Sequence, residues 1–176
     1  MNVASLFESL KAQFGARIAG ADAEALDPWI EVTAEGLVEV CQHLKQDPEL
    51  QFDMLHCVTA IDFLHTDPKK AAKSEWQPHL EILYHLSSLP RKHRVVLKVK
   101  TSRWKDDQAG QPPEVPSVSV VWKTALWHER EVYDLSGVVF TGHPDLRRIL
   151  CPEDWVGHPL RKDYEMPLEY HGIRGR

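Results

Sequence analysis

The sequence predicts an α+β fold of two layers, in which helices cover one face of a mainly antiparallel sheet and an extended, irregular C-terminal arm follows. Three observations support this prediction. Apolar residues recur at helical spacing near the N-terminus, apolar and polar residues alternate through the middle of the chain, and prolines accumulate after residue 142. With 176 residues, the chain is long enough to bury the core of one domain.

The first fifty residues predict two helices and a short strand. Apolar side chains recur at helical spacing over residues 3–14, which is typical of an amphipathic helix. Residues 29–32 are a candidate strand, and Thr33 can cap a second helix because its hydroxyl can accept a backbone N–H. That helix should end at Asp47, since the residue before a proline avoids helical backbone angles. Its apolar stripe consists of Leu37, Val40, Cys41 and Leu44.

Three strands are predicted between residues 52 and 101, because apolar and polar residues alternate there with period two. In the first strand, the predicted inward face carries Leu55, Cys57, Thr59, Ile61 and Phe63. In the next two strands, the inward faces carry Leu80, Ile82, Tyr84 and Leu86, and then Val95, Leu97 and Val99. Such alternation is typical of an antiparallel sheet that packs on one side. Residues 87–92 suit a hairpin loop, whereas 66–77 and 106–116 suit longer surface loops.

Composition and charge disfavour several classes of function. A net charge of −5 argues against a general nucleic-acid binder, which needs a basic surface. Cys41, Cys57 and Cys151 form no CxxC pair, so neither an iron–sulfur cluster nor a structural zinc site is predicted. We expect Cys41 and Cys57 to be small core side chains. The sequence carries no apolar run of about 20 residues and no apparent secretory signal, so we expect a cytoplasmic protein.

Residues 126–135 predict a helix with one charged arc, which ends at Gly137 because glycine readily adopts the left-handed cap conformation. The arc consists of Trp127, Arg130, Glu131 and Asp134. Arg130 lies four residues before Asp134 and can pair with it, and three residues after Trp127 and can stack on its ring. Two interpretations remain open: a solvated, salt-bridged surface, or a hydrogen-bonded network that fixes a neighbouring segment or subunit.

The same region contains residue types that bind metals or transfer protons, but not in the required spacing. The residues in question are His128, Glu129, Glu131, Asp134 and His143. No HExxH motif is present, and carboxylate-bridged dimetal sites need a matching motif on each of two helices. We therefore expect no metal here, and we expect Glu129 and Glu131 to be solvated rather than an acid/base pair.

Past residue 142 the chain should be mostly irregular and extended. A Gly-His-Pro triplet occurs at 142–144 and again at 157–159, where glycine and proline mark rigid turns and each histidine should hydrogen-bond within its turn. The basic residues of this region are Arg147, Arg148, Arg161 and Lys162. They either reach acidic or carbonyl groups of a partner or remain solvated. The expected division is an α+β domain over 1–142, which includes the charged helix, and a partner-wrapping segment over 143–176.

The segments EREVYDLSGVVFTGHPDLRRIL and EDWVGHPLRKDYE resemble the signature of the C subunit of the proton-pumping NADH:quinone oxidoreductase, respiratory complex I. The resemblance covers roughly the last third of the chain. Ser136 departs from the family pattern, which usually has a bulky apolar or aromatic residue there, so one packing contact is weakened. The matching residues are Glu129, Arg130, Glu131, Asp134, Gly137, His143, Pro144, Arg147, Arg148, Pro159, Arg161 and Lys162. The resemblance implies interface and structural roles for them and no catalysis.

What this resemblance implies is a non-redox accessory subunit of the peripheral arm. Such a subunit supports assembly and the transfer of electrons from NADH to quinone, coupled to proton translocation. Its implied partners are other peripheral-arm subunits, especially the quinone-site subunit, which hold it at the cytoplasmic face of the cell membrane. Flavin, iron–sulfur clusters and quinone are expected in those partners. Similar subunits occur in photosynthetic NDH-type complexes and membrane-bound hydrogenases, so the electron donor remains open. A free-standing enzyme and an adaptor outside respiration are the alternatives.

Overall fold

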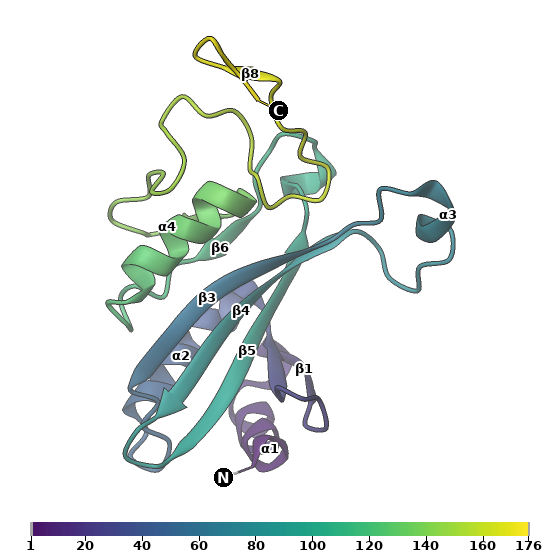
Figure 1. The fold of residues 1–176 in the computed structure, drawn as a ribbon. Coiled ribbons are helices and arrows are strands. Elements are labelled where there is room, and N and C mark those ends of the chain that lie inside the picture. The colour runs from purple at the N-terminus through teal and green to yellow at the C-terminus, as the bar shows by residue number, and fades with distance from the viewer. Residues whose placement is uncertain (1, 176) are drawn as a thin grey trace.

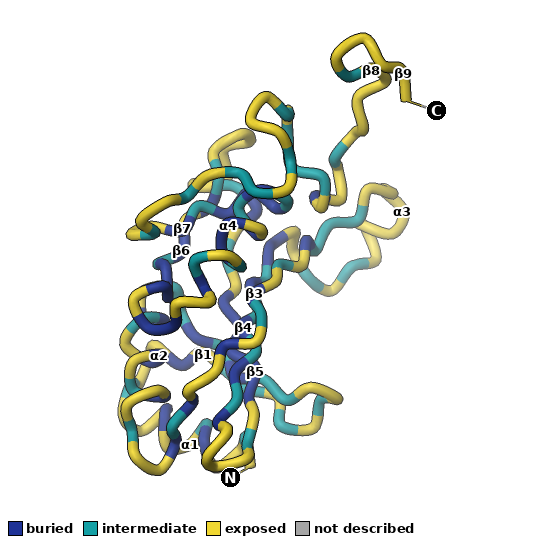
Figure 2. The backbone as a smooth tube through the Cα atoms, turned by 60° about the vertical axis from the view of Figure 1, so that its left-hand side comes forward, coloured by how far each residue is buried: buried dark blue, intermediate teal, exposed yellow. Residues whose placement is uncertain are grey.

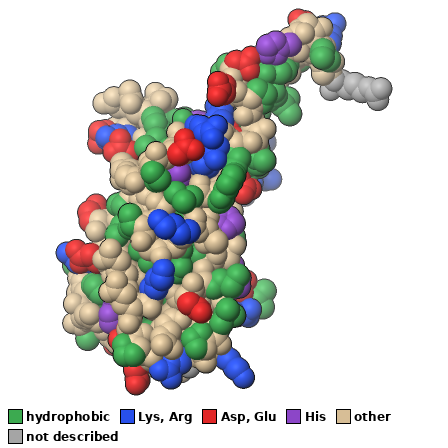
Figure 3. Space-filling model, turned by 90° about the vertical axis from the view of Figure 1, so that its left-hand side faces the viewer, with side chains coloured by type: hydrophobic (Ala, Val, Ile, Leu, Met, Phe, Trp, Pro, Cys, Tyr) green, Lys and Arg blue, Asp and Glu red, His purple; other side chains and the backbone are tan. Residues whose placement is uncertain are grey.

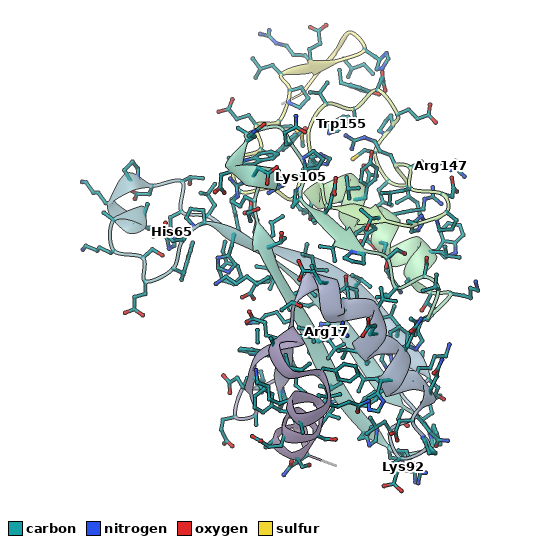
Figure 4. All side chains as sticks on the ribbon, turned by 180° about the vertical axis from the view of Figure 1, so that it is seen from behind. Arg17, His65, Lys92, Lys105, Arg147 and Trp155 are labelled. Carbon is teal, nitrogen blue, oxygen red and sulfur yellow. The ribbon has the colours of Figure 1, made fainter. Side chains whose placement is uncertain are left out.

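A computed structural model describes residues 2–175 and contains a five-stranded sheet with two helices on one face (Figure 1). The strands are β1 (Ile18–Asp22), β2 (Trp29–Val32), β3 (Met54–Phe63), β4 (His79–Ser88) and β5 (His93–Ser102), in the spatial order β1-β2-β5-β4-β3. Helices α1 (Val3–Phe14) and α2 (Leu37–Gln46) cover the face of the sheet that Figure 4 turns towards the viewer. The predicted α+β architecture is confirmed.

The sheet is mostly antiparallel but contains one parallel pair. Strands β3, β4 and β5 form a meander, in which Ile82 of β4 lies between Ala60 and Val99. Strand β2 runs parallel to β5, with Ile30 opposite Leu97, and β1 then pairs antiparallel with β2. The sequence pattern does not predict β1, because its small residues around Gly20 give no alternation of large side chains.

The predicted start and end of α2 are confirmed. The Thr33 hydroxyl accepts the N–H of Gly36 at 3.3 Å and so caps a short 3-10 turn (Ala34–Gly36) that continues into α2. The helix ends at Gln46, two residues before Pro48. Its predicted apolar stripe has no exposed surface: Leu37, Val40, Cys41 and Leu44. Local sequence signals therefore set both the length and the orientation of this helix.

The predicted inward faces are confirmed for two strands and wrong for the third. Strands β4 and β5 bury Leu80, Ile82, Tyr84, Leu86, Val95, Leu97 and Val99 as expected. In β3, a β-bulge between Leu55 and Cys57 inserts one extra residue relative to β4. Beyond it, Val58 and Asp62 are buried, whereas Thr59 and Ile61 are exposed and Cys57 is only half-buried. A one-residue shift exchanges the two faces of a strand, and alternation alone does not locate a bulge.

Two segments predicted as surface loops contain regular structure. The elements are the short helix α3 (Pro68–Ala71), the 3-10 turn η3 (Lys105–Asp107) and β6 (Glu114–Pro116). Strand β6 pairs in parallel with β7 (Val139–Thr141), which lies outside these two segments. Helix α3 lies on a projection between β3 and β4 that stands away from the body (Figure 1). In β6, Val115 pairs with Phe140 and is fully buried. The sequence does not predict this strand, because the prolines at 112, 113 and 116 are typical of a loop.

The last third of the chain consists of helix α4 (Ala125–Ser136), β7 and a segment that is largely exposed (Figure 2). Helix α4 lies beside the edge strand β3, where the Thr124 hydroxyl donates to the carbonyl of Leu55 at 3.2 Å. From Gly142 to Leu168 the described chain forms neither helix nor strand. The two-residue strands β8 (Glu169–Tyr170) and β9 (Ile173–Arg174) then form a hairpin at the projecting end (Figure 1).

Candidate interface site

The charged arc of α4 binds the chain segment that follows β7. Arg130 is buried, and its Nε and Nη2 donate to the carbonyls of Arg147 and Arg148, each at 3.1 Å. The guanidinium carbon lies 5.4 Å from the centroid of the Trp127 ring, so the predicted stacking is confirmed. The predicted pairing of Arg130 with Asp134 is wrong. Arg130 donates to the two backbone carbonyls, and the side chain that pairs with Asp134 is Arg148.

The carboxylate of Asp134 holds four consecutive residues of this segment. Its Oδ1 accepts from Arg148 Nη1 at 2.6 Å, and its Oδ2 accepts the N–H groups of Ile149, Leu150 and Cys151 at 2.7–3.0 Å. Burial alone raises the pKa of Asp134, but the three backbone N–H groups and Arg148 together lower it to about 2. The carboxylate therefore stays ionised, as the anion at the centre of a backbone nest. We call the contacts of Arg130 and Asp134 with residues 147–151 the helix clamp.

The C-terminal cap of α4 is shaped to receive the second Gly-His-Pro turn. Gly137 has φ +69°, and a Cβ added there would lie 2.5 Å from Cδ2 of His158. His158 Nδ1 donates to the carbonyl of Asp134 at 2.9 Å, and burial lowers the pKa of His158. Arg148 Nη2 also donates to the carbonyl of Gly157 at 2.9 Å. Gly137 is therefore required for two reasons, its backbone angle and the close approach of the imidazole.

A second group of contacts holds residues 161–163 against the end of the sheet. Arg103 forms two hydrogen bonds with Asp62, at 2.7 and 2.9 Å, and also donates to Asp163 at 2.7 Å. The buried Asp62 carboxylate accepts the N–H of Lys162 at 2.9 Å. Arg161 donates to the carbonyl of Arg103 at 2.9 Å. We call this group the sheet clamp.

Sequence reasoning missed Asp62 and Arg103, the two residues on which the sheet clamp depends. A carboxylate within the apolar run Ala60-Ile61-Asp62-Phe63 could have indicated a buried ion pair. The predicted register of β3, which ignored the bulge, placed Asp62 on the outer face. Arg161 is also buried, with its guanidinium 4.6 Å from the centroid of the Trp104 ring. Burial lowers the pKa of Arg161. The interpretation of Arg161 as solvated charge is therefore wrong, whereas the Lys162 side chain is exposed.

Glu129 is buried rather than solvated, which corrects the sequence-based expectation. It has no exposed surface, and its carboxylate accepts from Ser117 Oγ at 2.6 Å and from the N–H of Val118 at 2.8 Å. Burial, only partly offset by these two neutral donors, raises its pKa to about 7. Glu129 thus fastens α4 to the chain before it. Glu131, two residues on, is exposed.

The remaining motif residues lie in or beside the first Gly-His-Pro turn. His143 Nε2 donates to the carbonyl of Leu126 at 3.1 Å, and its Nδ1 accepts the N–H of Asp145 at 3.0 Å, as expected of a histidine that stabilises a turn. Arg147 is exposed, and its one ion pair within residues 2–175 is with Asp145, at 3.1 Å. Pro144 is exposed and Pro159 half-buried, while Ser136 is buried. Within residues 2–175, no group of three or more His, Cys, Asp or Glu side chains is arranged to hold a metal ion.

The fold is shared with a subunit of a respiratory membrane complex. A chain in the structure of the membrane-bound sulfane sulfur reductase, an archaeal respiratory membrane complex, superimposes with a TM-score of 0.65. The match covers 93% of this chain and 85% of that one, at 21% sequence identity. At this identity the comparison establishes the α+β fold alone.

The sequence comparisons identify the family. The family model for the respiratory-chain NADH dehydrogenase 30 kDa subunit matches residues 30–170. The NADH-quinone oxidoreductase C subunit of Chlorobium phaeobacteroides is 37% identical over 170 residues, which cover 96% of this chain and 92% of the relative. The chain therefore belongs to the 30 kDa subunit family of respiratory-chain NADH dehydrogenase.

Two further relatives bear the same name. The C subunit of Geobacter sulfurreducens is 41% identical over 160 residues, which cover 89% of this chain and 86% of the relative. The C subunit of Chloroherpeton thalassium is 36% identical over 170 residues, which cover 96% of this chain. This chain spans 63% of the length of the Chloroherpeton protein.

Proposed function

We propose that this chain is a non-redox accessory subunit in the peripheral arm of an NADH-quinone oxidoreductase. It supports assembly of the complex, and thereby electron transfer from NADH to quinone coupled to proton translocation. It acts by presenting residues 143–175 to neighbouring subunits, above all the quinone-site subunit. Support comes from the family to which the chain belongs and from the construction of the two clamps.

The observation that carries this proposal is an extended segment that two clamps bind to the domain and that nevertheless exposes apolar side chains. The helix clamp and the sheet clamp fix its backbone by hydrogen bonds to buried carboxylates. Along this segment, the exposed large apolar residues are Leu150, Val156, Leu160, Met166, Leu168 and Ile173. They make up half of the large apolar residues exposed in the described chain, and Figure 3 shows hydrophobic side chains along the arm. Exposed apolar groups on an ordered segment favour burial against a partner.

We place the redox groups and the membrane anchor in the partner subunits. Of the three cysteines, Cys41 is buried in α2, Cys57 lies on β3 and Cys151 lies in the helix clamp, so they share no single site. Burial raises the pKa of all three thiols, which disfavours the thiolate that a cluster requires. No helix among the described residues has the length and apolarity needed to cross a bilayer. We expect attachment at the cytoplasmic face of the membrane through these partners.

The test is recovery of an affinity-tagged copy from gently solubilised membranes, followed by mass spectrometry. We expect the other peripheral-arm subunits in equal stoichiometry, with the quinone-site subunit the last to dissociate as detergent or salt is increased. The purified lone chain should oxidise no NADH and show no visible absorbance. A tightly bound flavin or cluster in the lone chain, or copurification only with unrelated proteins, would contradict the proposal.

A further inference from the structure

The projection between β3 and β4 takes no part in either clamp. Residues 64–78 leave the end of two long paired strands and stand apart from both the helical layer and the C-terminal segment (Figure 1). Figure 4 shows His65 at the base of this projection, far from Trp155 of the arm. The projection contains aromatic and charged side chains that neither clamp uses.

Stacked rings fix the base of this projection. The Trp76 ring lies 4.6 Å from the His65 ring, at an interplanar angle of 30°, and 5.4 Å from the Phe63 ring in an edge-on arrangement. Phe63 in turn stacks on the buried His79, with ring centroids 4.6 Å apart and an interplanar angle of 4°. Such pairs add to the free energy of apolar burial and restrict ring orientation. The projection is therefore held in place from the core outward.

The projection also has three lysines that are available for a partner. Lys69, Lys70 and Lys73 are exposed, and within residues 2–175 none of their ammonium groups takes part in an ion pair. Asp67 accepts the N–H of Lys69 at 2.9 Å as the cap of α3, and the three lysines outnumber the carboxylates of Asp67 and Glu75 within residues 64–78. The projection is locally positive, although the whole chain has a net charge of −5.

The rings of His65 and Trp76 and two of the lysines line the same hollow. Its volume is about 410 Å³, and its lining residues are His65, Lys70, Lys73, Ser74, Glu75 and Trp76. A second hollow of about 280 Å³ is also lined by His65 and Trp76, together with Leu64 and Pro78. Aromatic surface rimmed by cationic groups suits a ligand that combines an apolar side chain with carboxylates.

We propose that residues 64–78 are a second docking site, which binds an acidic segment of a neighbouring subunit. Carboxylates of that segment contact Lys70 and Lys73, and one of its apolar or aromatic side chains packs against Trp76 and His65. This inference rests on the proposed function, because it requires the chain to be part of a larger assembly. It adds a contact that is independent of both clamps and lies on a different face of the molecule.

The first test is carbodiimide cross-linking of the gently solubilised complex, since this reagent joins an amine to a carboxylate only where the two are in contact. We expect cross-linked peptides that connect Lys70 or Lys73 with an Asp or Glu of another subunit. Cross-links from these lysines only to carboxylates of this chain would overturn the inference.

The second test is charge reversal with a matched control. The double variant Lys70→Glu, Lys73→Glu should lower recovery of the contacted subunit by roughly five-fold or more at physiological salt, because attraction becomes repulsion. The control Lys92→Glu, Lys123→Glu makes the same charge change at exposed positions outside the projection and should leave recovery unchanged. Thermal unfolding of both lone variants should match the unaltered chain, since all four side chains are exposed.

The outcomes separate this inference from the proposed function. Normal recovery of all subunits with the Lys70→Glu, Lys73→Glu variant would overturn the inference alone. Failure of the unaltered chain to recover any respiratory subunit would overturn both. If the unaltered chain binds phosphatidylglycerol vesicles, the variant does not, and no cross-link to another subunit forms, the occupant is a lipid surface and the inference of an acidic protein segment is wrong.

Discussion

Asp134 and Arg148 form an ion pair of 2.6 Å in which the same carboxylate also accepts three consecutive backbone N–H groups. The carboxylate has no exposed surface, and its partners come from a segment that has no regular structure of its own. One buried anion therefore replaces the backbone pairing that a helix or strand would provide. The order of the C-terminal segment depends on contacts with α4 rather than on its own sequence preferences.

Replacing Asp134 with Asn should release residues 149–151 from the helix clamp. The amide keeps the shape of the side chain but loses the negative charge that binds Arg148 and the three N–H groups. We expect a loss of about 2–4 kcal/mol in the free energy of unfolding. Hydrogen exchange should accelerate at the amides of 149–151. The Asp145→Asn variant, which affects only an exposed pair with Arg147, should change the free energy of unfolding by less than about 1 kcal/mol.

Replacing Gly137 with Ala should destabilise the protein by about 2 kcal/mol or more, because a positive φ and a collision with His158 act together. Gly142 provides the control, since it has φ +82° but no heavy atom within 4 Å of an added Cβ. Gly142→Ala should therefore be destabilising by only about 1 kcal/mol. Urea denaturation of the two variants measures the difference. Equal losses of unfolding free energy in the two variants would show that the contact with His158 does not contribute to the cost of the Gly137→Ala change.

Glu129 should make stability depend on pH between about 4.5 and 7. Its pKa is raised from an ordinary value of 4.5 to about 7 in the folded state, so the folded protein binds the proton more tightly than the unfolded chain. This contribution to stability is complete below pH 4.5, decreases as pH rises to about 7 and then stays constant. The total decrease is about 3 kcal/mol.

The Glu129→Gln variant should abolish that decrease, because glutamine does not ionise. At pH 8 it should be more stable than the unaltered chain, and at about pH 4 the two should be nearly equal. Urea denaturation at both pH values measures this, and Glu131→Gln is the control because Glu131 is exposed on the same helix. A variant with the same pH dependence as the unaltered chain would assign the titration to another group.

Replacing Arg130 with Ala should leave the domain folded but reduce incorporation into the complex. The change removes two hydrogen bonds to the carbonyls of Arg147 and Arg148, worth about 1–2 kcal/mol, without exposing much of the core. We expect faster exchange at residues 147–151 and several-fold lower recovery with partner subunits. Arg17→Ala, which removes an exposed pair with Glu39 far from the arm, should assemble normally. Equal recovery of both variants would contradict the role proposed for the helix clamp.

Local sequence patterns predicted the elements whose interactions lie close together in the chain. The cap of α2 by Thr33, its end before Pro48 and the end of α4 at Gly137 each depend on residues within one helical turn. The alternation in β4 and β5 correctly located their buried faces. The signature segments of the last third of the chain indicated the family, and the family model confirms it.

Several features of the site could not be predicted because their partners are distant in sequence. Asp62 and Arg103 are 41 residues apart, and Asp62 and Lys162 are 100 residues apart, so no spacing rule connects them. The sequence predicts that Arg130 pairs with the nearby Asp134, whereas the acceptors of Arg130 are the carbonyls of Arg147 and Arg148, 17 and 18 residues away. Once the chain folds, Arg148 reaches that carboxylate from a segment that the first Gly-His-Pro turn directs back along α4.

By itself, the sequence determined the covering helices, the β4–β5 hairpin and the family, because these follow from short-range hydrogen bonding, periodic burial and motif identity. Only the tertiary structure decided the bulge that turns Asp62 inward, the burial of Glu129 and the assignment of each arginine to its acceptor. The physical reason is that a charged side chain has several partners of similar strength in an unfolded chain. Packing then selects one of them, because a buried charge must be paired.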